Sequence, residues 1–185
     1  RYYRGGLEPV EYVSMTLTYD GVEEASTGEP STATSTIEMR GLVVDTVGDD
    51  AVAHASDGDT SAGSALVANK GADNLISLRE AIDAANNTAG LDTIEFTVAG
   101  LGSQVFALAS MLPHITDEFF LDGTTQTEWV SGSFNPIVID GNNLVGDGLY
   151  FTGAADGSEV RGLVVRDFSD DAIDVDVGAD NVTIA

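Results

Sequence analysis

Apolar and polar residues alternate along two early segments of the chain, 13–19 and 33–39, as they do in half-buried strands. The acidic stretch between them has the composition of a turn, so the two segments predict a β-hairpin. Two strands alone are marginally stable in water. We therefore expect residues 1–40 to be the last hairpin of a preceding β domain, or a leader pair of strands docked on the rest of the chain.

The stretch 77–96, SLREAIDAANNTAGLDTIEF, changes from the period of a strand to that of a helix. Ser77 can cap a helix, and Glu80 three residues later completes a capping box. The residues that follow at helical spacing form one apolar stripe: Leu78, Ala81, Ile82 and Ala85. A helix of about ten residues is stable only if such a stripe is packed. The sequence thus predicts one short helix that is held by tertiary contacts.

From residue 92 onward, short apolar runs are separated by Gly, Asp and Asn. Some of these runs recur: Leu149 matches Ile173 after 24 residues, and Val160 matches Val182 after 22 residues. A repeat of about 20–25 residues without intervening helices favours a β-solenoid, whose strands stack in parallel, over a leucine-rich repeat. A sandwich of antiparallel strands is the competing architecture.

Charge narrows the classes of function. Asp and Glu number 31 against seven Lys and Arg, which gives a formal net charge of −24. This negative charge would repel nucleic acid and anionic membrane surfaces. It is compatible with calcium binding, with a salty medium or with a role in keeping the protein soluble. The chain has no Cys for disulfides or thiolate metal sites, and no apolar run approaches the ~20 residues of a membrane span.

Several segments resemble the CSLREA domain, which opens right-handed parallel β-helices in large secreted or surface-bound bacterial proteins. They cover about residues 41–185 in the order of that family: LVVDT, DGDTSA, ISLREAIDAANNTAGLDTIEF, LPHITD, LDGTTQ, IVIDG and VRGLVVRDF. The chain departs from the family at Ile76, where the motif usually has Cys, and after LDGTTQ, where it has TEWVSGSFNP in place of Pro-Gly. The resemblance implies a fold and a context but no reaction, because the family has no agreed catalytic residues.

With this resemblance, the expected fold class is all-β: a right-handed parallel β-helix (β-solenoid) with a short N-terminal capping α-helix. Residues 1–40 are the hairpin tail of a preceding domain or a leader. Residues 41–98 are the CSLREA-like cap region with one helix and the first strand, Thr93 to Val98. Residues 99–185 are coils of the β-helix, truncated at the C-terminus, so we expect the chain to be part of a longer multidomain protein.

The charged pair Arg79 and Glu80 has a structural interpretation. Glu80 closes the capping box, and Arg79 either pairs with a carboxylate or covers the end of the first coil with its aliphatic stem. A β-helix has an open sheet edge at each end, and solenoids cover it with an atypical terminal unit. The predicted cap residues are Ser77, Leu78, Arg79, Glu80, Ala81, Ile82 and Ala85.

Calcium is a candidate ligand of the loop 57–63, where Asp57, Asp59 and Ser61 place oxygen atoms at alternate positions. The loop departs from the EF-hand pattern, since its Gly is misplaced and Ala68 stands where a bidentate Glu is needed. A Gly/Asp turn is the alternative.

Two further groups are candidates for substrate binding. Asp174 and Asp176 lie on one face of a predicted strand in the acidic stretch 170–176, a pattern that suits carbohydrate, calcium or plain solvation. Trp129, in an irregular insertion with Phe134, could stack on a sugar ring or fold back over the coil. The two histidines, His54 and His114, lie apart and lack a nucleophile motif, so no catalytic residue is assigned.

Three hypotheses result. The first is a non-catalytic structural or adhesive stalk, extracellular or on the bacterial cell surface, that contacts extracellular polysaccharide or a cell-surface glycan. The second is the opening segment of a β-helix polysaccharide lyase or glycoside hydrolase. The third is a passive module stabilised by Ca2+.

Overall fold

The structure is a computed structural model that describes residues 13–20, 32–39, 41–49, 58–144 and 146–185. It divides the chain into two units, residues 1–40 and residues 41–185. In the first unit, β1 (Val13–Asp20) pairs antiparallel with β2 (Thr32–Met39), as the alternation of apolar residues predicts. The role of this hairpin stays a prediction.

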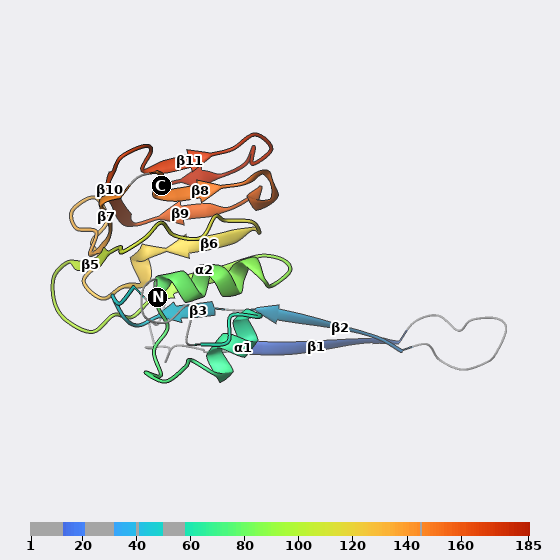
Figure 1. The fold of residues 1–185 in the computed structure, drawn as a ribbon. Coiled ribbons are helices and arrows are strands. Elements are labelled where there is room, and N and C mark those ends of the chain that lie inside the picture. Colours follow the sequence, from blue (N-terminus) through green and yellow to red (C-terminus); the bar gives the residue numbers. More distant parts are fainter. Residues whose placement is uncertain (1–12, 21–31, 40, 50–57, 145) are drawn as a thin grey trace. The chain divides into compact units, whose positions relative to one another are not determined.

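The second unit consists mostly of strands in parallel sheets (Figure 1). The largest sheet has the strand order β12-β9-β6-β4-β3. In chain order, the strands of this sheet are β3 (Gly41–Val44), β4 (Asp92–Phe96), β6 (Phe119–Asp122), β9 (Glu159–Arg161) and β12 (Thr183–Ile184). All pairs between the named strands of this unit are parallel, so a sandwich of antiparallel strands is the wrong architecture for it.

Two smaller sheets accompany the five-stranded one. The second sheet contains β5 (Gln104–Ala107), β7 (Ile137–Leu144) and β10 (Leu163–Phe168). The third contains β8 (Leu149–Phe151) and β11 (Ile173–Val175), and Ile115 adds a parallel bridge to Phe151. The helices of the described chain are α1 (Gly63–Ala68), α2 (Leu78–Asn86) and the 3-10 turns η1 (Gly123–Thr125) and η2 (Gly153–Ala155).

The chain visits the three sheets repeatedly in one order. From β6 it passes to β7 and β8, and from β9 to β10 and β11, before β12 returns to the first sheet. We call each such passage a rung. The passage from β4 through β5 to Ile115 is an earlier rung of the same order.

The register between rungs confirms one predicted match and corrects another. Leu149 pairs with Ile173, as the repeat predicts. Val160 pairs with Ile184 and not with Val182, so both matches have a spacing of 24 residues. The error has a simple cause: a shift of two residues keeps every side chain on the same face of a strand, so alternation alone cannot distinguish the two registers.

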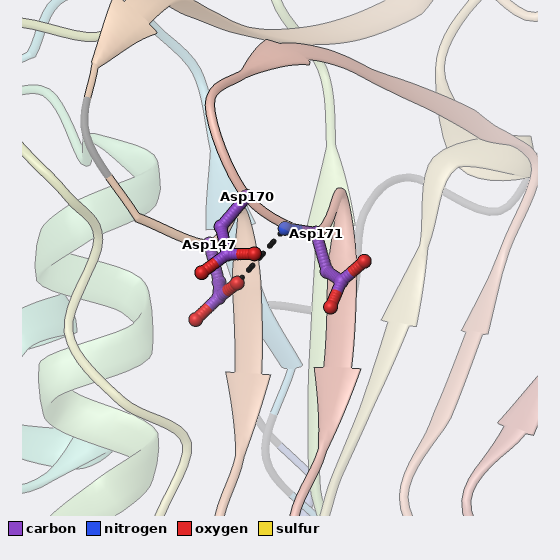
Figure 2. Close-up of side chains that lie close together, drawn as sticks. All are labelled: Asp147, Asp170 and Asp171. Atoms are coloured by element: carbon purple, nitrogen blue, oxygen red, sulfur yellow. Dashed lines mark hydrogen bonds between the residues drawn. The ribbon is translucent and has the colours of Figure 1, made fainter.

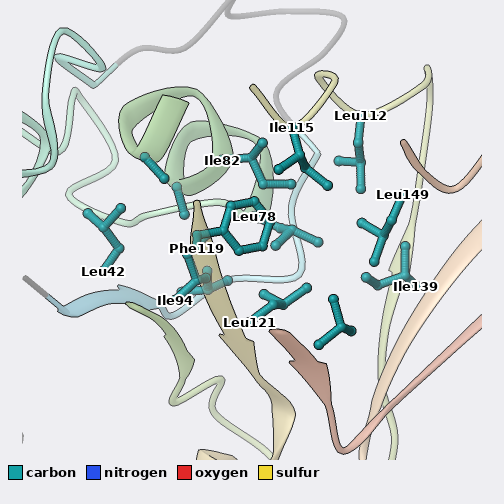
Figure 3. Close-up of a cluster of buried hydrophobic side chains, with 14 of the residues drawn as sticks. Leu42, Leu78, Ile82, Ile94, Leu112, Ile115, Phe119, Leu121, Ile139 and Leu149 are labelled. Carbon is teal, nitrogen blue, oxygen red and sulfur yellow. The ribbon is translucent and has the colours of Figure 1, made fainter. Parts of the chain in front are cut away.

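Aliphatic side chains of successive rungs lie over one another in the interior. In the five-stranded sheet, Ile94 pairs with Leu121 and Leu121 with Val160, and all three are at most 1% exposed. Leu78 and Ile82 of α2 belong to the same core cluster (Figure 3). Among the described residues, no helix is long and apolar enough to cross a membrane.

Candidate functional site

Helix α2 begins with the capping box that the sequence predicts. The Ser77 hydroxyl accepts a hydrogen bond from the Glu80 backbone N–H at 3.3 Å, and the Glu80 carboxylate accepts one from the Ser77 N–H at 3.0 Å. This arrangement satisfies backbone donors that the first turn of a helix leaves unpaired. The apolar stripe is buried, because Leu78, Ala81, Ile82 and Ala85 are each at most 2% exposed.

Glu80 also makes a contact outside the capping box, which the sequence did not predict. Its other carboxylate oxygen accepts a hydrogen bond from the Gly58 N–H at 2.9 Å, which ties the segment before α1 to α2. Glu80 is only 1% exposed, so these bonds also compensate the burial of its charge. A Cβ atom at Gly58 would lie 2.5 Å from Leu66 Cδ1 and 2.9 Å from Glu80 Oε1. An alanine at this position would therefore require Leu66 or Glu80 to shift.

Arg79 has the carboxylate partner that the sequence left unspecified. Its Nε donates to Asp49 Oδ1 at 2.8 Å, while Nη1 and Nη2 donate to the carbonyls of Met111 and Ser110 at 2.6 and 2.9 Å. Asp49 in turn accepts from the Ala109 N–H at 2.6 Å. The ion pair thus satisfies three backbone groups of residues 109–116, which we call the edge segment.

Asn86 pairs with the edge segment in the manner of a strand. Its Nδ2 donates to the His114 carbonyl at 2.8 Å, and its Oδ1 accepts from the Thr116 N–H at 2.7 Å. Ile115, which lies between these two residues, uses its own N–H and carbonyl for the parallel bridge to Phe151. Because a side-chain amide carries the same donor and acceptor as a peptide group, Asn86 takes the place of a further strand residue beside Ile115.

The edge that the helix covers is not that of the first strand. The sequence places the helix just before that strand, Thr93 to Val98, as a cover for the open edge at the end of the first coil. That strand is β4, and its edge pairs with β3. Side chains of α2 instead form hydrogen bonds with backbone groups of the edge segment. The apolar stripe of the helix fills the interior beside β3 and β4.

The predicted calcium loop is described only in part, since Asp57 and His54 lie outside the described residues. Asp59 and Ser61 are exposed, and the Asp59 carboxylate accepts a hydrogen bond from the Ser61 N–H at 3.1 Å. Hydrogen bonds from Ser61 lower the pKa of Asp59. This contact is the Asp turn of the alternative interpretation, and calcium binding there stays a prediction.

Asp170 and Asp171 meet a third carboxylate, Asp147, as Figure 2 shows. One oxygen from each lies within 4.8 Å of the others. Asp147 is half-buried and accepts a hydrogen bond from the Asp171 N–H at 3.0 Å. Asp147 was not a candidate from the sequence, although the 24-residue spacing between Leu149 and Ile173 aligns it with Asp171.

Asp174 and Asp176 lie around Tyr150, a neighbour that the sequence did not suggest. Asp174 pairs in register with Tyr150 on β8, and the Tyr150 ring lies 4.5 Å from the His114 ring. A hydrogen bond with Asp176, burial, and the charges of Asp176, Asp174 and Asp147 raise the pKa of Tyr150. Asp176 and His114 are exposed, whereas Tyr150 and Asp174 are half-buried, and together they form an acidic and aromatic surface on the third sheet.

Trp129 does not join that surface. It follows η1 and is half-buried, with its indole Nε1 close to Gly162, where a Cβ atom would lie 3.0 Å away. The side chain therefore folds back over the corner between β9 and β10. Phe134 is also half-buried and forms a bridge with Val130.

Charged side chains of adjacent rungs pair on the outer faces of the sheets. Asp122 receives two hydrogen bonds from Arg161, at 3.0 and 2.6 Å, and Arg161 also lies 4.5 Å over the Phe120 ring. Burial pushes the pKa of Asp122 upward, but hydrogen bonds from Arg161 and Thr124 outweigh it and hold the pKa below its ordinary value. Burial and the charge of Asp122 raise the pKa of neighbouring Glu95.

Comparison with protein-family models, curated proteins and solved structures finds no match for this chain.

Proposed function

We propose that residues 41–185 form the capped start of a right-handed parallel β-helix. Three features support the proposal. All pairs between the named strands of the described unit are parallel, the chain visits the sheets in one repeated order, and each of the last two strand pairs joins residues that are 24 positions apart. Parallel crossovers within a sheet are right-handed in nearly all proteins, which gives the handedness.

The observation that carries the capping role is the strand-like pairing of Asn86. An uncovered parallel edge exposes backbone groups that can pair with another chain. Asn86 and Arg79 satisfy such groups at His114, Thr116, Ser110 and Met111. A helix side chain cannot extend a sheet further, so the pairing ends at α2.

The capped stack acts as a rigid, non-catalytic stalk that is secreted or held at a bacterial cell surface. The net charge of −24 and the resemblance to the CSLREA domain support this location. The surface around Tyr150, Asp174 and Asp176 is where the stalk would contact a glycan. The alternative, a lyase or glycoside hydrolase, stays a prediction.

Replacement of Asn86 tests the cap. Asn86→Leu keeps a side chain of similar size but removes both hydrogen bonds to the edge segment, so it should lower the free energy of unfolding by about 1–3 kcal/mol. It should also promote association at micromolar concentration, because the edge is exposed. Urea titration and sedimentation velocity measure the two effects.

Asn181→Leu is the matched control. Asn181 is exposed and bonds the Asp156 side chain at the other end of the stack. This variant should stay monomeric and lose less stability. The capping role is refuted if Asn86→Leu behaves like the control.

A further inference from the structure

The outer face of the third sheet carries its aromatic and polar side chains in rows that cross the strands. In the first row, the ring centres of His114 and Tyr150 lie 4.5 Å apart, and Tyr150 pairs in register with Asp174. The second row lies two positions further along the same segments and contains Thr116, Thr152 and Asp176. Because adjacent strands lie about 4.8 Å apart, each row is about 10 Å long.

The two rows combine ring surface with groups that form hydrogen bonds. His114 and Asp176 are exposed, and Tyr150 and Asp174 are half-buried, so all four side chains border solvent. A hydrogen bond with Asp176 holds the Tyr150 side chain in place. An aromatic ring offers an apolar surface to the flat side of a sugar, and carboxylates accept hydrogen bonds from its polar groups. The face is therefore suited to a ligand that is both ring-shaped and rich in donors.

The electrostatic potential at this face is negative. A hydrogen bond with Asp176, burial, and the charges of three carboxylates raise the pKa of Tyr150, because a second negative charge there is unfavourable. Further carboxylates lie where β8 and β11 begin, as Figure 2 shows for Asp147 and Asp171. Negative charge thus lies at both ends of the two rows.

The described cations pair with carboxylates in other parts of the fold. Each described Lys and Arg side chain lies at most 3.6 Å from such a partner: Lys70 from Asp45, Arg79 from Asp49, Arg161 from Asp122 and Arg166 from Asp140. A polysaccharide of acidic sugars would therefore be repelled from the face of the third sheet, whereas a positively charged ligand would be attracted to it.

We propose that this face binds a glycan that carries free amino groups. Its sugar rings lie against Tyr150 and His114, and its ammonium groups pair with Asp174 and Asp176. Hydrogen bonds between an ammonium group and a carboxylate are stronger than neutral ones, and an ammonium group is also attracted to the face of an aromatic ring. The inference rests on the proposed glycan contact and specifies the class of glycan.

The aromatic rings favour an organic cation over a metal ion. Calcium takes about six to eight oxygen ligands and gains nothing from a neighbouring ring. An amino sugar uses both the rings and the carboxylates, and the net charge of −24 attracts it from a distance.

A pair of oligosaccharides that differ only in acetylation tests the proposal on the unmodified chain. Hexamers of glucosamine and of N-acetylglucosamine with the same linkage are titrated by calorimetry at about pH 5.5, where the free amines are protonated. The glucosamine hexamer should bind about tenfold or more tightly than its acetylated counterpart, and added salt should weaken it. A hexamer of galacturonate should not bind.

Amide shifts in NMR spectra locate the contact. The glucosamine hexamer should shift the amides of Thr116, Thr152 and Asp174. Shifts at these positions with Ca2+ alone, and none with the hexamer, would identify a metal site and overturn the proposal.

Substitutions separate this face from the general attraction of an acidic protein. Asp174→Asn should weaken binding of the glucosamine hexamer by about fivefold or more. Glu159→Gln is the matched control, because it removes one charge from β9 of the first sheet and should leave the affinity nearly unchanged. Equal losses in the two variants would assign the binding to net charge alone and overturn the proposal.

The outcomes also distinguish this inference from the proposed function. Equal affinity for the acetylated and free hexamers overturns the preference for amino groups but leaves the glycan contact in place. Binding of neither hexamer overturns both. The capping role of α2 is independent of either result.

Discussion

At the scale of single residues, side chains complete the hydrogen bonding of backbone that lies at a sheet edge. Asn86 bonds the two residues that flank Ile115, and Arg79 bonds two carbonyls of the same segment while Asp49 neutralises its charge. These partners lie about 30 residues from each other along the chain. A carboxylate partner was one of the two roles that the sequence offered for Arg79, and it named no particular partner, because no local pattern reports contacts between distant segments.

Asp122 gives a prediction for acid stability. Its pKa is depressed in the folded protein, so its contribution to stability is present above the ordinary pKa of 3.8 and is lost as pH falls through the lower folded value. Glu95 acts in the opposite direction: its pKa is raised above 4.5, so its contribution is present below that value and is lost as pH rises through the folded pKa.

Asp122→Asn removes the first of these contributions. Urea unfolding between about pH 3 and pH 7 should show a smaller loss of stability on acidification in the variant than in the wild type. Glu159→Gln is a suitable control, because Glu159 lies 3.9 Å from the same arginine and is more exposed. If acidification lowers the free energy of unfolding equally in the wild type and in Asp122→Asn, then Asp122 does not contribute to acid sensitivity in this way.

At the scale of elements, α2 is the helix that the sequence predicts, with its capping box and its buried stripe. The prediction succeeded because capping and amphipathic spacing are local signals. Its position was predicted less well. β3 and β4 pair across a gap of about 50 residues in sequence that contains both helices, and nothing local in LVVD indicates that it precedes β4 in the sheet.

The contact between Glu80 and Gly58 predicts a strong effect of a single methyl group. Gly58→Ala places a Cβ atom against Leu66 and Glu80, so α1 should shift or detach from α2, and the free energy of unfolding should fall by about 1–3 kcal/mol. Chemical denaturation measures the change. Gly41→Ala is the matched control, because the nearest atom, Glu95 Oε2, would lie 3.8 Å away. Equal stability of the two variants would show that the close contact at Gly58 is not maintained in solution.

At the scale of the whole second unit, the repeated passage through the three sheets stacks aliphatic side chains in rows that run through the interior. Equivalent residues of successive rungs stack in parallel, and the inner faces form one core that includes α2 (Figure 3). The 24-residue spacing of the last rung and the short strands could be predicted from Leu149 and Ile173. The preceding rung is longer, since Leu121 pairs with Val160. The contact between Tyr150 and His114 could not be predicted, because it forms only when side chains of different rungs come together.

The central claim is that α2 closes one end of a parallel stack through Asn86. The most direct test is the exchange rate of the Thr116 amide hydrogen, measured by NMR in the wild type and in Asn86→Leu. Loss of the bond to Asn86 Oδ1 should speed exchange by about tenfold or more, whereas the Thr152 amide, which donates to the Ile115 carbonyl, should change little. Fast exchange of Thr116 in the wild type, or the same slow rate in both proteins, would contradict the account.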